Sequence, residues 1–86
     1  MNTSTPNTTR ITKLDFSDRI YVYLSSGDML TLPYTYTKRI AKATPNLLED
    51  YRLIADGIGV HFPQIDEDIS LKGILRYKTS HELMAS

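Results

Sequence analysis

Aliphatic and tyrosine side chains alternate strictly in one short run near the start of the chain. The run is Ile20, Tyr21, Val22, Tyr23 and Leu24. Because successive side chains of a strand point to opposite sides, the aliphatic residues share one face and the tyrosines share the other. The pattern therefore predicts a strand with one face in the core.

Two neighbouring segments extend this strand into a meander. Residues 10–16 are predicted to form the preceding strand, with Leu14 and Phe16 on one face and Ile11 on the other. After a Ser-Ser-Gly-Asp turn, residues 29–32 are predicted to form the following strand.

The hydrophobic period changes after Pro33. Apolar positions between residues 36 and 43 recur at helical spacing, and the basic side chains fall largely off that stripe. Thr44 and Pro45 then combine a helix-capping residue with a proline suited to a first helical turn. Two short helices are predicted here.

The clearest local signal in the second half is an Asp-Gly step between two apolar runs, residues 53–55 and 58–62. Such a step predicts a hairpin closed by a two-residue turn. Residues 65–68 are predicted to form an acidic loop, and Ser70 is placed to cap a closing helix that begins near Leu71.

These elements predict a single α+β domain over residues 10–78. Its expected architecture is a small antiparallel sheet of about five strands, a meander plus a C-terminal hairpin, with two or three short helices on one face. Residues 1–9 are predicted to form a flexible tail, because few of their side chains can offset their ordering entropy by burial. Residues 79–86 are predicted to form a C-terminal tail.

Composition narrows the classes of function. Ten Lys+Arg and ten Asp+Glu residues give zero formal charge, so the strong positive field of a non-specific nucleic-acid binder is missing. The absence of cysteine excludes disulfides, thiolate catalysis and zinc ribbons. No apolar run approaches the roughly 20 residues of a membrane span and no signal peptide is recognised, so a soluble cytoplasmic protein is expected. The scattered glycines match no phosphate-binding loop, and no cofactor is expected.

One dense run of carboxylates stands out. Asp66, Glu67 and Asp68 follow His61 by five to seven residues. Converging oxygens hold hard cations, so one hypothesis is a metal- or ligand-binding, enzyme-like site with the histidine as a further ligand or a base. However, three consecutive carboxylates in an extended segment cannot all face one ion. The alternative is that they satisfy backbone donors and stabilise the positive end of the following helix, and we expect no metal.

A basic cluster suggests a second alternative. Lys38, Arg39 and Lys42 give the first predicted helix a local charge of +3, beside Tyr34 and Tyr36. Aromatic rings stack on bases and cations hold phosphates, so a nucleic-acid-binding regulator is one hypothesis. The solvated face of an amphipathic helix also explains three cations, and nucleic acid is not favoured as a direct ligand.

Tyrosine is abundant for so small a core. The chain has six tyrosines, two phenylalanines and no tryptophan. Because Tyr21 and Tyr23 lie off the aliphatic face of their strand, either helices cover both sides of the sheet or these rings are presented to a partner. Tyr21, Tyr23, His61 and the acidic loop are therefore the candidate contacts.

Residues 57–70 combine a glycine-x-glycine step, a His-aromatic-Pro step and the run Asp-Glu-Asp-Ile-Ser. Upstream lie the Ile-x-Val-x-Leu strand, a Leu-Pro step and an Ala-Thr step. With these motifs, residues 16–75 resemble the bacterial family called domain of unknown function 2442. Phe62 stands where that family usually has tryptophan, which keeps the apolar packing and loses an indole N–H donor.

The resemblance implies a small α+β domain with no established activity. Members are sometimes fused to a helix-turn-helix, which we do not expect so close to the end of this sequence, and are often encoded beside a second uncharacterised family in apparent toxin–antitoxin pairs. We therefore expect a non-catalytic protein-interaction module and not an enzyme. It would be the antitoxin-like or accessory member of a bacterial two-gene pair, with the product of a neighbouring gene as its protein partner and a homo-oligomer as the alternative.

Overall fold

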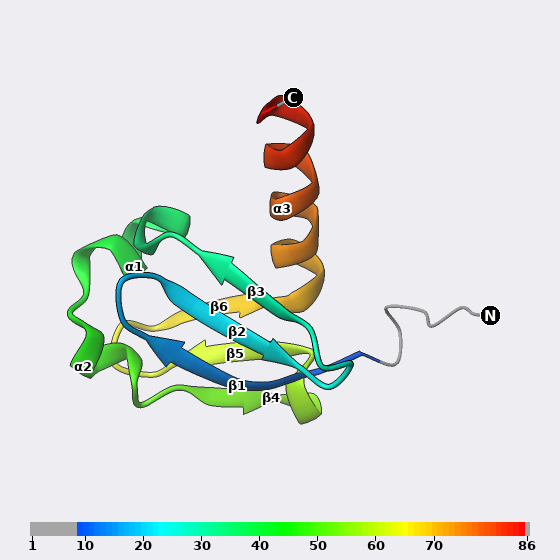
Figure 1. Ribbon diagram of the computed structural model, residues 1–86. Coiled ribbons are helices and arrows are strands. Elements are labelled where there is room, and N and C mark those ends of the chain that lie inside the picture. The colour runs from blue at the N-terminus through cyan, green and yellow to red at the C-terminus, as the bar shows by residue number, and fades with distance from the viewer. Residues whose placement is uncertain (1–8, 86) are drawn as a thin grey trace.

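The computed structural model describes residues 9–85, and their side chains up to residue 80. The predicted tail is outside this range except for Thr9. Two three-stranded antiparallel sheets form the body of the molecule (Figure 1). The first sheet has the order β1 (Ile11–Phe16), β2 (Ile20–Leu24) and β3 (Met29–Leu32), and the second has the order β4 (Arg52–Ile54), β5 (Gly59–Phe62) and β6 (Glu67–Ser70).

Helical segments connect and close the sheets. They are the 3-10 turns η2 (Tyr34–Tyr36) and η3 (Ala55–Gly57) and the helices α1 (Lys38–Lys42), α2 (Pro45–Leu48) and α3 (Leu71–Ala85). The predicted α+β class is confirmed, as are the two short helices after the meander. Thr37 caps α1, because the backbone N–H of Ile40 donates to its Oγ1 at 3.1 Å. Pro45 begins α2 as predicted.

The strands divide between two sheets where the sequence predicted one. Side chains from elsewhere in the chain contact both outer edges of the first sheet, and the second hairpin forms a separate sheet with β6. At β1 the backbone N–H of Leu14 donates to Tyr51 Oη at 3.1 Å. At β3 the carbonyl of Thr31 accepts from Lys78 Nζ at 2.9 Å.

The two sheets share one core. Phe16 of β1 meets Phe62 of β5 in an edge-to-face contact, with ring centroids 6.3 Å apart. Aliphatic residues from both sheets and all three helices are buried with Phe62, and no polar or charged residue in the described part of the chain is buried with them. The buried aliphatic residues are Ile11, Leu14, Ile20, Val22, Leu24, Leu32, Ile40, Leu48, Val60, Ile69, Leu71 and Ile74.

A bulge in β1 changes the predicted faces of that strand. Ile11 and Leu14 are both buried, although their spacing predicts opposite faces. The register shifts between Ile11 and Lys13, so Thr12 is an extra residue on β1. Because an extra residue reverses the alternation, Ile11 turns to the same side as Leu14. The prediction that Ile11 and Leu14 lie on opposite faces is wrong for this reason.

The second hairpin is confirmed, but its turn is longer than predicted. Ile54 pairs with Gly59, so residues 55–58 form the connection instead of Asp-Gly alone. Asp56 and Gly57 have φ angles of 60° and 105°. Gly57 is also packed against β1, where a Cβ would lie 2.1 Å from the carbonyl oxygen of Ile11. The longer turn thus brings this loop onto the first sheet, and only glycine fits at the contact.

The C-terminal part is more regular than predicted. Glu67 and Asp68, expected in a loop, belong to β6. Ser70 caps α3 as predicted, since its Oγ accepts from the backbone N–H of Gly73 at 2.9 Å. The helix continues past residue 78 to Ala85 and projects from the sheets (Figure 1). Within residues 9–85, no helix combines the length and apolar character needed to cross a membrane.

Candidate functional site

The outer face of the first sheet carries both candidate tyrosines. Figure 1 views the molecule from this side, and no helix crosses in front of β1, β2 and β3. The core therefore lies behind this sheet. The sequence left open whether helices cover both sides of the sheet, and in the structure no helix covers the side that carries the tyrosines. Tyr21 and Tyr23 are both half-buried there. Their cross-strand neighbours complete what we call the tyrosine face, which consists of Lys13, Asp15, Tyr21, Tyr23, Met29 and Thr31.

Contacts at the edges of the rings hold the tyrosine face in place. Lys13 Nζ lies 5.2 Å from the centroid of the Tyr23 ring, a cation–π arrangement. Tyr21 Oη donates to Asp18 Oδ1 at 2.8 Å. This hydrogen bond raises the pKa of Tyr21 and lowers the pKa of Asp18, because it stabilises the phenol together with the carboxylate. Both rings are thus oriented before any partner binds.

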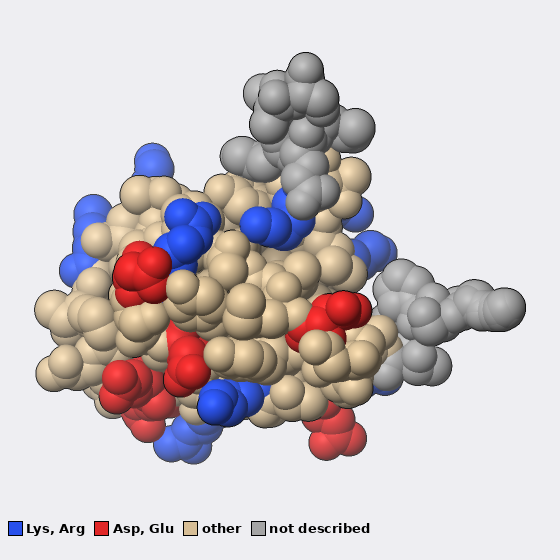
Figure 2. Space-filling view, viewed as in Figure 1, with Lys and Arg blue, Asp and Glu red and all other residues tan. Residues whose placement is uncertain are grey.

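Charge is sparse in the middle of this side of the molecule. Figure 2, drawn in the same direction, shows a broad uncharged area with acidic and basic side chains mostly around its margins. Met29, at 45% exposure, adds apolar area to the same face. Aromatic and apolar area within a charged rim is the usual composition of the centre of a protein interface.

His61 and Asp68 meet on the outer face of the second sheet. They occupy directly opposite positions on β5 and β6, and His61 Nδ1 lies 2.5 Å from Asp68 Oδ1. Arg52 of β4 is the partner of His61 on its other side. Because Val60 and Phe62 of β5 are buried, His61 between them points away from the core. The Asp68 carboxylate therefore pairs with a side chain and not with the backbone donors that the sequence suggested.

The other two residues of the predicted acidic cluster do not join this pair. Asp66 lies in the turn before β6, and its carboxylate is 3.7 Å from Arg39 Nη1. Glu67 is adjacent to Asp68 on a strand, so the two side chains leave on opposite sides. In the described part of the chain, no three His, Asp or Glu side chains come together as metal ligands would. The geometry does not build the site that the metal or ligand-binding hypothesis requires.

The basic residues of α1 are exposed, but one of them has a structural contact. Lys38, Arg39 and Lys42 all lie on the surface. Arg39 Nη1 donates to the backbone carbonyls of Ile65 and Asp66, at 3.3 and 2.5 Å. Arg39 thereby fastens α1 to the turn before β6.

The aromatic residues beside α1 also serve the fold. Tyr34 Oη donates to the carbonyl of Ser17 at 2.8 Å. Tyr36 packs edge-to-face on Tyr77 of α3, with centroids 4.9 Å apart. Burial raises the pKa of both Tyr34 and Tyr36. Both tyrosines beside the basic cluster therefore have contacts within the fold, Tyr34 through its hydroxyl and Tyr36 through its ring.

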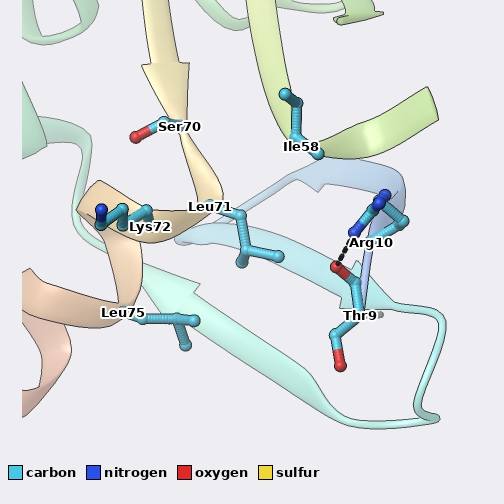
Figure 3. A pocket seen from close by; sticks show the side chains of 7 residues that line it. All are labelled: Thr9, Arg10, Ile58, Ser70, Leu71, Lys72 and Leu75. Atoms are coloured by element: carbon cyan, nitrogen blue, oxygen red, sulfur yellow. Dashed lines mark hydrogen bonds between the residues drawn. The ribbon is translucent and has the colours of Figure 1, made fainter. Parts of the chain in front are cut away.

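The sequence did not reveal a groove of about 680 Å³ beside the start of α3. Figure 3 shows it between residues that precede β1, the loop before β5 and the first turns of α3. Ile58, Leu71 and Leu75 supply apolar lining, and Arg10 and Lys72 supply charge. Leu71 and Leu75 have the spacing of one helix face, and this spacing does not distinguish the wall of a groove from a core stripe. The signal that could have revealed the groove is the basic character of α3 next to an isoleucine in a turn.

The chain matches a family model described as "Protein of unknown function (DUF2442)" over residues 11–80. It belongs to the DUF2442 family. The resemblance seen in the sequence is thereby confirmed. No curated protein matches this DUF2442 chain significantly.

Two solved structures are similar to this DUF2442 domain. One is the crystal structure of a protein of unknown function from Rhodospirillum rubrum, with a TM-score of 0.72 and 25% identity over 81% of this chain and 88% of that chain. The other is the solution NMR structure of an uncharacterised protein from Chromobacterium violaceum, with a TM-score of 0.69 and 24% identity over 78% of this chain. The match covers 64% of that second protein, slightly less than two thirds of its length. The similarity to the second structure shows the fold alone.

Proposed function

We propose that this DUF2442 chain is a small non-catalytic protein-interaction module that binds its partner through the tyrosine face. The observation that carries the proposal is the pair of half-buried rings, Tyr21 and Tyr23, on the uncovered side of the first sheet. Tyrosine buries a large area at a small cost in side-chain entropy, and it is enriched among residues that dominate binding energy.

The contacts of the two rings support this function further. Their bonds to Asp18 and Lys13 restrict the side chains in the free protein. A partner then loses less free energy in ordering them, which is the advantage of a pre-organised surface. The exposed thioether of Met29 beside them adds an adaptable apolar contact.

For the partner, we propose the product of a neighbouring gene, with this chain as the antitoxin-like or accessory member of the pair. The gene pairing that the family resemblance implies supports this assignment. A second copy of the chain is the alternative occupant of the tyrosine face.

Co-expression with the product of each neighbouring gene tests the proposal. We expect a complex of fixed stoichiometry by size-exclusion chromatography with light scattering. The double variant Tyr21→Ser/Tyr23→Ser should weaken it by at least about 30-fold, as expected of two interface hot spots. The matched control is Arg52→Ser on the outer face of the second sheet, which should bind as the parent does. Free chains only, or a complex indifferent to the tyrosine variant, would overturn the proposal.

A further inference from the structure

The groove beside α3 lies outside the tyrosine face, and its apolar lining ranges from the exposed Ile58 through the half-buried Leu75 to the buried Leu71. Leu71 and Leu75 are one helical turn apart, and both point from α3 toward the side where Thr9 and Arg10 lie (Figure 3). Ile58 contributes from the loop before β5 and is 47% exposed, more than any other large apolar residue of the described chain. The volume of about 680 Å³ is within the range of sites that accept a ligand or a few side chains of a partner.

The charges around this lining have one sign. Arg10 and Lys72 are its charged residues, and no carboxylate lines the groove. Along α3 the next charged residues, Arg76 and Lys78, are basic as well. Thr9 and Ser70 add hydroxyl groups. Apolar area with a basic border is complementary to a segment that carries both apolar and acidic side chains.

Nothing in the described fold requires Ile58 to be apolar at its position. Its backbone N–H bonds to Ile54 and its carbonyl accepts from Leu71, so the main chain alone holds the loop. An exposed isoleucine gains its transfer free energy only when another surface covers it. At 47% exposure, Ile58 therefore keeps apolar area that a partner can cover.

We propose that this groove docks an acidic amphipathic segment of a partner protein. Apolar side chains of that segment cover Ile58 and Leu75, and its carboxylates face Lys72. The proposal goes beyond the function assigned above, because it names a second docking site and the chemistry of its occupant. It holds whether or not the tyrosine face binds the same partner.

Selection of a displayed library of random peptides on the immobilised full chain tests the proposal. We expect enriched peptides that combine Asp or Glu with Leu, Ile, Val or Phe, and binding that weakens as salt rises. Ile58→Asp and Lys72→Glu should each reduce the affinity of these peptides by about tenfold or more in fluorescence anisotropy. Both residues are exposed, so the variants should keep the circular dichroism spectrum and melting temperature of the parent.

Two matched variants serve as controls. Met29→Asp places the same charge on an apolar residue of similar exposure on the tyrosine face. Lys38→Glu reverses an exposed lysine on α1. Both should bind the selected peptides with unchanged affinity.

Four results would overturn the proposal. The first is no enrichment of acidic peptides. The second is binding that survives Ile58→Asp and Lys72→Glu; if Met29→Asp abolishes it instead, the tyrosine face is the site and the function proposed above is supported. The third is self-association of the parent that Ile58→Asp removes, which makes a second copy the occupant. The fourth is tighter peptide binding after deletion of residues 1–8, which makes that segment the occupant.

Discussion

The two sheets have the same strand number and the same antiparallel order, yet their outer faces differ in chemistry. The central strand of the first sheet presents Tyr21 and Tyr23, whereas the central strand of the second presents His61 next to a covered Gly59. On the second sheet the imidazole is paired with Asp68, so its polar capacity is used within the fold. On the first sheet both rings are only half-buried, although Lys13 lies over the ring of Tyr23. The comparison teaches that sheets sharing one core can differ outside it: the second pairs its central imidazole, whereas the first leaves aromatic area exposed, as the proposed function requires.

Removal of the Phe62 side chain should lower the free energy of unfolding more than any other change described here, because this ring packs between the two sheets. The side chain is fully buried and contacts Phe16 of the first sheet. Phe62→Ala should lower the free energy of unfolding by about 3–5 kcal/mol. Urea denaturation measures this change, with Met29→Ala as an exposed control that should change it by less than about 0.5 kcal/mol. A loss below that of a surface substitution would mean that the sheets are stable independently.

A pair of glycine variants tests the contact between the turn at Gly57 and strand β1 of the first sheet. Gly57→Ala adds a Cβ at a positive φ and against the backbone of Ile11, whereas Gly27→Ala adds it at a positive φ into open space. We expect a loss of about 1 kcal/mol for Gly27→Ala and at least about 2 kcal/mol more for Gly57→Ala. Thermal unfolding of both variants gives the difference. Equal losses would show that strain in φ alone, and not contact between the sheets, accounts for both.

The edge of β1 provides a smaller test of the division into two sheets. Tyr51→Phe removes the hydroxyl that accepts from the backbone N–H of Leu14. The expected loss is about 1 kcal/mol, with faster hydrogen exchange at the Leu14 amide. Tyr34→Phe is the matched control: it removes the hydrogen bond to the Ser17 carbonyl and should leave the Leu14 amide protected. Unchanged exchange in the Tyr51 variant would contradict the role of this hydroxyl.

The smallest expected effect concerns the orientation of the tyrosine face. The bond from Tyr21 to Asp18 raises the pKa of the phenol and lowers that of the carboxyl. Its contribution to stability is lost as the pH falls through the folded-state pKa of Asp18, and again as the pH rises through the folded-state pKa of Tyr21. In Asp18→Asn, an NMR titration should return the pKa of Tyr21 toward the ordinary tyrosine value. Asp28→Asn, at the other end of the sheet, should leave it raised.

Local patterns allowed much of the fold to be predicted. The alternation in β2 and the capping by Ser70 depend on neighbours in sequence, and both were predicted correctly. The division into two sheets depends on contacts between distant residues, such as Tyr51 with Leu14, which no local pattern records. The bulge at Thr12 was missed for a related reason, since one extra residue is visible only against the partner strand.

The sites were predictable to a similar extent. The alternation placed Tyr21 and Tyr23 on a face of their own, and the structure leaves that face uncovered. The separation of Glu67 from Asp68 followed from the geometry of a strand. The groove was not predicted, because it depends on how Leu75 lies relative to residues that precede β1, although its basic residues and Ile58 were visible in the sequence.

The lysine that reaches the outer edge of β3 has a consequence for behaviour at high concentration. A strand edge with unpaired carbonyls can template another chain, and this strand carries apolar residues. Lys78 occupies the carbonyl of Thr31 and places a positive charge where an incoming strand would dock. This lysine therefore opposes edge-to-edge pairing of β3 with a second chain, which is the first step toward a fibril.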